Sequence, residues 1–125
     1  MILDTNALSA AADHDPAVIA LLSRAEVMAI PVIVLGEYRH GIAQSKNRAS
    51  YENWVSALLN DCLVLDITEP TTRYYAEITL ELKKKGKPIP TNDLWIAALC
   101  RQHSLPLVSS DRHFDLVRGN RRIEW

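Results

Sequence analysis

Acidic side chains stand at the ends of several predicted strands and helices of this chain. Asp4 directly follows the apolar run 1–3, and Asp111 follows a second apolar run at 105–109. Asp93 stands at the start of a predicted helix, whereas Glu37 lies inside another. Because ligands bind at the carboxyl ends of strands in a parallel sheet, Asp4, Asp93 and Asp111 can meet at that edge. Glu37 joins them only if its helix crosses the same edge.

Carboxylates that meet in a partly dry site can support metal-dependent chemistry. Close like charges repel, and at least one pKa is then driven upward. A divalent cation removes that conflict, and oxygen ligands without a nearby Cys-His pattern favour Mg²⁺ or Mn²⁺ over zinc. Such ions activate water and stabilise the charge that builds up on a phosphate. The four acids therefore predict a site for a hard cation.

Each acid also has an ordinary structural explanation. Asp4 and Asp111 can initiate turns, where aspartate is common. Asp93 can favour the helix macrodipole while a polar neighbour acts as the cap. Glu37 can lie on a solvated helix face, although most of its neighbours between 32 and 38 are apolar. If the four carboxylates lie close together in the fold, the metal site is favoured over these ordinary explanations.

Short apolar runs alternate with helical periods along the chain. Asp15 followed by Pro16 predicts the start of a helix with aspartate as the N-cap, and Gly86 can end a later helix in the left-handed conformation. Buried strands that alternate with helices indicate an α/β protein with a mostly parallel sheet. The expected strands are 1–3, 27–31, 62–66, 105–109 and 122–125; one expected helix starts near 15, and the others span 31–44, 47–59, 68–85 and 92–103.

The composition is that of an ordinary globular domain. The chain has 125 residues, of which 48% are apolar and 23% charged, and its formal net charge is −1. This size suits one hydrophobic core, so we expect a single domain over residues 1–125. The N-terminus lacks a basic region followed by an apolar one, and no apolar run reaches the roughly 18 residues that span a bilayer. We therefore expect a cytoplasmic protein without membrane contact.

The cysteines and histidines form no recognisable motif. Cys62 and Cys100 make no CxxC pair and suit buried thiols in a reducing compartment, although a disulfide between them stays open. The histidines are scattered, and we assign none of them to catalysis. His113 is close enough to Asp111 for a peripheral role, but a surface position is the simpler interpretation.

Short motifs that contain the four acids carry a resemblance to a known family. They are LDTN at 3–6, GE at 36–37, NDLWIAA at 92–98 and SSDRHFD at 109–115. Their order and spacing, across essentially the full chain, resemble those of PIN-domain ribonucleases of the VapC toxin type. The motif at 3–6 alone would be weak evidence, whereas all four in this order are specific.

The resemblance implies a three-layer α/β/α sandwich with a mostly parallel sheet of about five strands. It also implies an Mg²⁺- or Mn²⁺-dependent endoribonuclease that leaves a 5′-phosphate, is silenced by a VapB-like antitoxin and commonly forms a homodimer. Carried over to this chain, the catalytic metal ligands would be Asp4, Glu37, Asp93 and Asp111. Supporting roles would fall to Thr5, Asn6, Asn92 and Asp115, with Asp115 as a possible fifth acid.

Positive charge for RNA phosphates is expected near the last motif. The arginines closest in sequence to Asp111 are the better candidates: Arg112, Arg118, Arg121 and Arg122. The lysines at 83–87 are better explained as a solvated helix end. For an antitoxin, the family analogy suggests an apolar segment that lies between helices near 18–22 and 33–42.

Two other functions also fit an α/β protein with acids at its strand ends. A haloacid-dehalogenase-like phosphatase would need a DxD arrangement, but Asp4 is followed by Thr5 and Asn6. A receiver domain would need a phosphorylated acid after a middle strand, here Asp66, and a lysine after a late strand, which is missing at 109–111. A PIN-like module that only binds RNA is the remaining alternative, although all four acids are present.

Overall fold

The computed structural model describes residues 1–125 and contains a five-stranded parallel sheet with the strand order β3-β2-β1-β4-β5. The chain builds the sheet outward from β1 in one direction and then from β4 in the other, so the order reverses between these two strands. Such a switch point leaves a crevice at the carboxyl ends of the strands. The strands are β1 (Ile2–Leu3), β2 (Ala29–Pro31), β3 (Leu63–Leu65), β4 (Leu107–Val108) and β5 (Arg122–Ile123).

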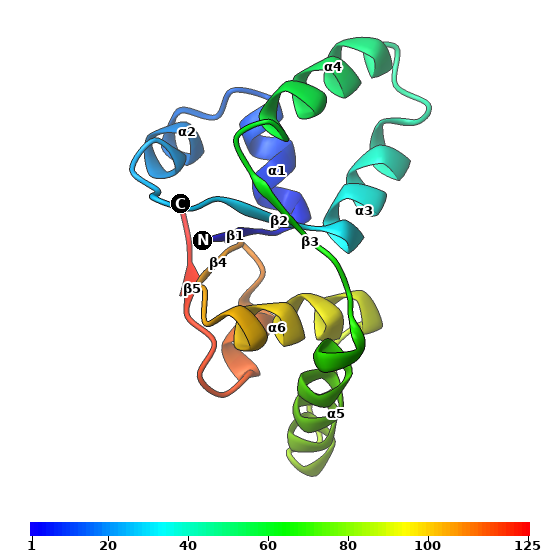
Figure 1. The fold of residues 1–125 in the computed structure, drawn as a ribbon, viewed down its shortest axis with the longest axis vertical. Coiled ribbons are helices and arrows are strands. Elements are labelled where there is room, and N and C mark those ends of the chain that lie inside the picture. Colours follow the sequence, from blue (N-terminus) through cyan, green and yellow to red (C-terminus); the bar gives the residue numbers. More distant parts are fainter.

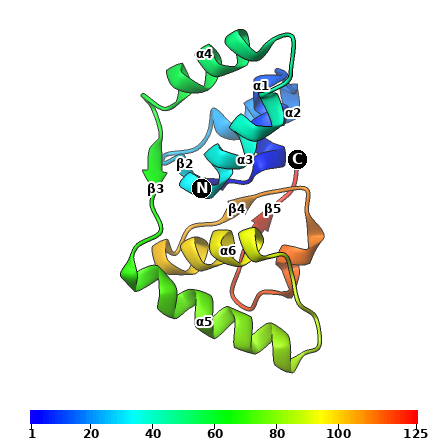
Figure 2. The same ribbon diagram turned by 90° about the vertical axis from the view of Figure 1, so that its right-hand side faces the viewer.

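Helices cover both faces of the sheet, as Figures 1 and 2 show from two directions. One layer contains α1 (Thr5–Ala12), α2 (Pro16–Leu22), α3 (Val32–Ile42) and α4 (Arg48–Leu58). The other contains α5 (Glu69–Lys84) and α6 (Thr91–His103), and a short 3-10 helix, η1 (Arg112–Leu116), follows β4. The expected three-layer α/β/α sandwich with a parallel sheet is therefore confirmed. No helix is long and apolar enough to cross a bilayer.

The central strands are buried on both faces, as their continuous apolar sequences predict. Every residue of β1, β2 and β4 is buried, whereas the edge strand β3 exposes 57% of Leu63 and 43% of Val64. α6 contains the most buried residues of any helix, and its run 96–100 is buried in full. This helix stands on the same hydrophobic core as β1 and β4.

Most helix boundaries follow the expected local chemistry. The Asp15 side chain accepts hydrogen bonds from the amides of Ala17 and Val18, so its expected role as the N-cap of α2 is confirmed. Gly86 has a φ of +66° just after α5, which is the left-handed conformation that ends a helix at glycine. α6 begins at Thr91, one residue earlier than expected, and its N-cap, Pro90, makes no side-chain hydrogen bond.

The sequence predicted no helix directly after the first strand, but α1 begins there. Asp4 is the N-cap of α1, and its Oδ1 accepts the Thr5 amide at 2.8 Å. The alanines between 7 and 12 favour the helix and need little space against the sheet. Because the hydrophobic pattern of 5–12 is weak, the sequence did not predict this short helix, which packs on the core.

Leu99→Ala tests the central position of α6. Leu99 is fully buried, so its truncation should lower the free energy of unfolding by about 2–5 kcal/mol through lost burial and a residual cavity. Leu80 on α5 is 53% exposed, and Leu80→Ala is the matched control, expected to stay within about 0.5 kcal/mol. Urea unfolding of both variants measures the difference. Equal stabilities would contradict this packing.

Candidate metal centre

An open cavity of about 620 Å³ lies at the carboxyl ends of β1 and β4, next to the start of α6. We call it the acidic cavity, because four carboxylates line it together with small polar side chains. A second cavity, of about 440 Å³, lies at the opposite edge of the sheet and contains no carboxylate in its lining. The residues of the acidic cavity are Asp4, Thr5, Asn6, Ser9, Glu37, Pro90, Thr91, Asn92, Asp93 and Asp111.

Asp4 is the most tightly held of the four acids. Asp4 is only 4% exposed. Besides the Thr5 amide on Oδ1, its Oδ2 accepts the Ser109 hydroxyl at 2.6 Å and the Asn6 side-chain amide at 3.1 Å. Hydrogen bonds to a carboxylate from three donors fix its orientation and satisfy its charge. Asp4 is thus held in place by neighbours at the start of α1 and directly after β4.

Ser109 and Asn6 join the ends of these two central strands. The fully buried Ser109 hydroxyl donates to Asp4 and accepts the main-chain amide of Asp111 at 3.0 Å. Asn6 donates to Ser109 Oγ at 3.3 Å, and its carbonyl oxygen accepts the amide of Ser110 at 3.2 Å. The loop that carries Asp111 is therefore tied to the helix start that carries Asp4.

Glu37 reaches the cavity because α3 begins immediately after β2. One turn and a half into that helix, its carboxylate oxygen Oε1 accepts the Thr5 hydroxyl at 3.1 Å. The expectation that Thr5 and Asn6 orient acidic groups thus has a direct counterpart in their hydrogen bonds to Glu37 and Asp4. Which edge α3 would cross could not be judged from the sequence.

Asp93 lies in the first turn of α6, but it does not cap this helix with its side chain. The helix has no side-chain cap hydrogen bond, and the Asp93 side chain is only 16% exposed. Burial raises the pKa of Asp93 above its ordinary value, and the nearby charges of Asp4 and Asp111 act in the same direction. His113 opposes this rise. Burial and the neighbouring carboxylates therefore disfavour a negative charge on Asp93 in the metal-free protein.

His113 lies between two of the acids, although sequence reasoning gave it a peripheral role at most. Its Nε2 is 2.7 Å from Asp93 Oδ2, and its Nδ1 is 3.1 Å from Asp111 Oδ1. Despite its short contact, Nε2 is buried and has no partner with hydrogen-bond geometry. The only sequence signal was the position of His113 two residues after Asp111.

Asp115, the possible fifth acid, does not line the acidic cavity. Its two carboxylate oxygens accept Nε and Nη2 of Arg122 at 2.9 and 3.0 Å. This guanidinium lowers the pKa of Asp115 through the hydrogen bonds and its charge. Arg122 Nη1 also donates to the main-chain carbonyl of Ser109 at 3.0 Å. Arg122 therefore links Asp115 to the end of β4, next to the loop that carries Asp111.

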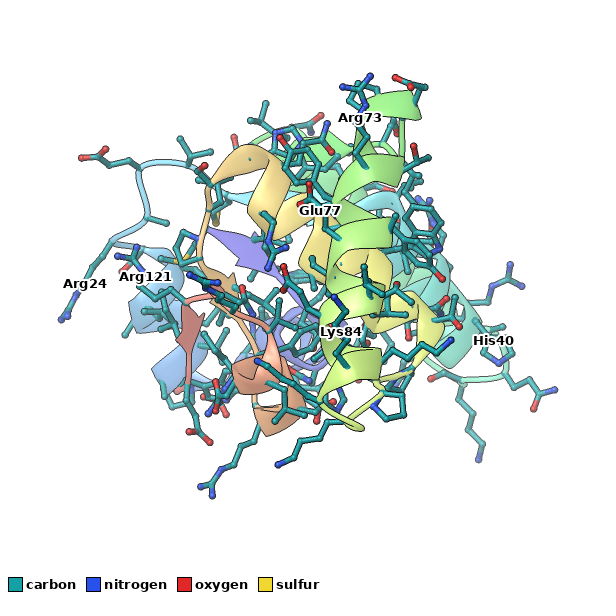
Figure 3. The ribbon with its side chains drawn as sticks, turned by 90° about the horizontal axis from the view of Figure 1, so that it is seen from below. Arg24, His40, Arg73, Glu77, Lys84 and Arg121 are labelled. Carbon is teal, nitrogen blue, oxygen red and sulfur yellow. The ribbon has the colours of Figure 1, made fainter.

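The arginines suggested for RNA contact lie in different places. The Arg122 side chain is only 10% exposed, and its guanidinium is engaged by protein acceptors. Arg118 and Arg121 line the cavity at the opposite edge of the sheet. Figure 3 shows Arg121 on the other side of the molecule from His40. Only Arg112, exposed in η1, adjoins Asp111.

The donors at this edge fit a divalent cation. Asp93, Asp111 and His113 bring one oxygen or nitrogen each within 4.8 Å of one another, and Asp4 and Glu37 line the same cavity. Carboxylate oxygens are the preferred ligands of Mg²⁺ and Mn²⁺. Asp66, the acid that a receiver domain would use, is exposed and lies outside this cavity.

Known proteins similar to this chain include named ribonucleases. The chain matches the PIN-domain family over residues 1–120. It is similar to Ribonuclease VapC2 of Rickettsia felis, at 31% identity over 114 residues that cover 88% of this chain and 85% of the relative. It is also similar to Ribonuclease VapC2 of Haemophilus influenzae, at 32% identity with 99% and 96% covered.

Solved structures give the same fold over nearly the whole chain. The VapBC2 complex of Rickettsia felis, bound to a DNA fragment from its promoter, aligns with a TM-score of 0.87 and 28% identity, covering 99% of this chain and 97% of that one. FitAB bound to the IR36 DNA fragment aligns with a TM-score of 0.83 and 27% identity, covering 98% and 93%.

Ser109→Ala tests the link between the two central strands. The substitution removes the shortest hydrogen bond to the buried Asp4 carboxylate, so it should lower the free energy of unfolding by about 1–3 kcal/mol at neutral pH. Ser110→Ala is the matched control, because Ser110 is exposed and contributes its main-chain amide, which the substitution keeps. Denaturant unfolding of metal-free protein compares the two variants. A Ser109→Ala variant as stable as Ser110→Ala would contradict a stabilising role for the Ser109–Asp4 hydrogen bond.

Proposed function

The chain belongs to the PIN-domain family, and on this premise we propose that it is a divalent-metal-dependent endoribonuclease. The observation that carries the proposal is the convergence of four carboxylates on one open cavity at the switch point of the sheet. The relatives named as ribonucleases support the same activity. The ion we propose is Mg²⁺ or Mn²⁺, held by Asp4, Glu37, Asp93 and Asp111.

The chain's own residues prepare the site for hydrolysis of a phosphodiester. A bound divalent cation lowers the pKa of a water molecule and offsets the charge that develops on phosphorus. Asp4 keeps its orientation through its hydrogen bonds, and Asp93 is aimed by the rigid first turn of α6. Thr5 orients Glu37 in the same way. The bond that breaks joins phosphorus to the 3′ oxygen, which leaves a 5′-phosphate.

The shape beside the acidic cavity supports an extended RNA strand as substrate. Two further hollows, of about 250 and 450 Å³, share Glu37 with the acidic cavity. One contains Ser9 and Tyr51, and the other contains His40 and Asn92. Open hollows of this kind, lined by both polar and apolar side chains, suit an unpaired strand, whose phosphates and bases remain accessible. Arg112 is the exposed cation that adjoins Asp111.

An antitoxin of the VapB type is the proposed partner. VapBC complexes from Rickettsia felis and Haemophilus influenzae share the fold of this chain. On this chain, Ile19 of α2 and Val32 of α3 are each 41% exposed, and Val32 borders the hollow next to Glu37. An apolar segment of a partner can cover exposed apolar side chains of this kind. A homodimer is part of the same proposal.

RNA cleavage by purified, antitoxin-free protein tests the activity. We expect cleavage with Mg²⁺ or Mn²⁺, none with EDTA, and a loss of about 100-fold or more in Asp93→Asn, because a buried metal ligand loses its charge. The variant should remain folded, since the amide has the same shape and its burial costs less than that of a charge.

Asp66→Asn is the matched control for this experiment. Asp66 also follows a strand, β3, but it is exposed and lies outside the acidic cavity, so cleavage should be unchanged. Cleavage that survives EDTA or Asp93→Asn would contradict the proposed mechanism. RNA binding without cleavage under all metal conditions would favour a binding module, and phosphate release from small phosphoesters alone would favour a phosphatase.

A further inference from the structure

Five positively charged side chains without a carboxylate partner gather at the end of α5 and the start of η1. All five are exposed, and none of the ion pairs within the protein involves any of them. No acidic residue interrupts the chain between positions 82 and 92. We call this surface the cationic ridge, and it consists of Lys83, Lys84, Lys85, Lys87 and Arg112.

The two parts of the cationic ridge touch each other although they are far apart in the sequence. Lys85 Nζ donates to the main-chain carbonyl of Leu116 at 3.4 Å, across a separation of 31 positions. This contact places the end of α5 against η1. Figure 3 shows η1, in orange, beside the end of α5 that carries Lys84. The five cations therefore belong to one continuous surface.

The cationic ridge begins where the wall of the acidic cavity ends. Arg112 directly follows Asp111, so the Cα atoms of these residues are about 3.8 Å apart. Lys87 precedes Pro90 by three positions, which limits the distance between their Cα atoms to about 11 Å. Asp111 and Pro90 both line the acidic cavity. A chain that occupies this cavity can thus continue directly onto the ridge.

The end of a helix explains only part of this positive charge. The dipole of α5 favours cations in its last turn, where Lys83 and Lys84 lie. Lys87 follows the left-handed Gly86 and lies outside the helix, and Arg112 is the first residue of η1, where a dipole does not favour a cation. Like charges at such close spacing also repel one another. The ridge is therefore suited to an anionic ligand with several charges.

An RNA strand in the acidic cavity needs positive charge outside it. Four carboxylates line the cavity without any lysine or arginine, and a single divalent cation would offset only part of their repulsion toward a polyanion. We propose that the cationic ridge binds the phosphates of a single-stranded RNA where the strand leaves the acidic cavity. The inference rests on the proposed function, because it takes RNA as the ligand, and it adds the surface that holds the strand.

The chemistry of the ridge also defines what it contributes. Lysine binds phosphate as a flexible point charge, and contacts to phosphates position a strand without reading its bases. The ridge should therefore increase the affinity for RNA of any sequence, in proportion to the number of phosphates that it neutralises. Selection of a particular cleavage sequence belongs to other parts of the protein.

RNA binding by the full-length protein in EDTA tests the ridge, with a fluorescent single-stranded RNA of about 16 nucleotides as the probe. The double variant Lys84→Gln with Lys87→Gln removes two charges and keeps Lys85, which holds η1. Its affinity should fall about tenfold at about 0.1 M salt. The slope of log affinity against log salt should become shallower by about 1.4, because each lysine on a phosphate contributes about 0.7.

Arg24→Gln with Arg121→Gln is the matched control, because it changes the net charge by the same amount. Both arginines are exposed and take part in no ion pair, and Figure 3 shows both of them away from Lys84. The control should keep its affinity within about threefold and its salt slope unchanged. Equal losses in the two double variants would show that RNA responds to net charge alone, and the proposal would be wrong.

Protection of lysines from acetylation gives a second readout on the wild type, without any variant. Added RNA should slow the reaction of Lys84, Lys85 and Lys87 with an amine-specific reagent, measured by mass spectrometry. Unchanged acetylation of all three, or no RNA binding by the wild type at low salt, would contradict the proposal. Protection by polyglutamate but not by RNA would instead assign the ridge to an acidic protein segment.

These experiments separate the ridge from the catalytic activity. They contain no divalent metal and follow no turnover, so a failure of RNA cleavage counts only against the proposed function. Conversely, cleavage that depends on Asp93 together with an RNA affinity that ignores the ridge lysines counts only against this inference.

Discussion

Repulsion among carboxylates at one edge of the sheet is the constraint that the surrounding structure must satisfy. Asp4, Glu37, Asp93 and Asp111 line one cavity, and burial together with the neighbouring charges raises the pKa of Asp93. The chain offsets this repulsion with donors in fixed positions. The Ser109 hydroxyl, the Asn6 amide and the Thr5 amide all point at Asp4, and the Thr5 hydroxyl points at Glu37. A bound cation would offset the remaining repulsion among the four carboxylates.

The sheet topology explains why this concentration of charge forms at all. The strand order reverses between β1 and β4, so the chain leaves these neighbouring strands toward opposite layers. The crevice between the departing segments lies directly above the strand ends that carry Asp4 and Asp111. Helices α3 and α6 then contribute one acid each from the two layers. The apolar core below keeps all four elements rigid.

Two arginines, Arg122 and Arg101, stabilise the fold through hydrogen bonds within the protein. Arg122 is almost covered and connects Asp115 with the carbonyl of Ser109. Arg101 joins α6 to α5 through paired hydrogen bonds to Glu81 at 3.1 and 3.0 Å. The Arg122 guanidinium is satisfied within the protein, and Arg101, Arg118 and Arg121 line the cavity at the opposite edge, so Arg112 is the exposed arginine that adjoins Asp111. Inside the acidic cavity, an ion would therefore be the main source of positive charge for a phosphate.

Local sequence chemistry determined much of this protein. Short apolar runs fixed the central strands because they are buried on both faces, Asp15 with Pro16 fixed a helix start, and Gly86 fixed a helix end. Acids placed directly after strands indicated the functional edge. The short alanine-rich helix at 5–12 was missed, because its pattern is weak and its stability comes from packing against the core.

Only the tertiary structure decided which polar groups meet. Glu37 reaches the cavity because α3 turns across the edge of the sheet, a direction that no local pattern encodes. Asp115 and Arg122 pair with each other because η1 folds back beside β5, a contact that their sequence positions did not predict. His113 lies between Asp93 and Asp111 for the same reason. Contacts between residues far apart in sequence depend on how the helices and strands pack. That packing is determined by side chains throughout the hydrophobic core, so no single local pattern predicts it.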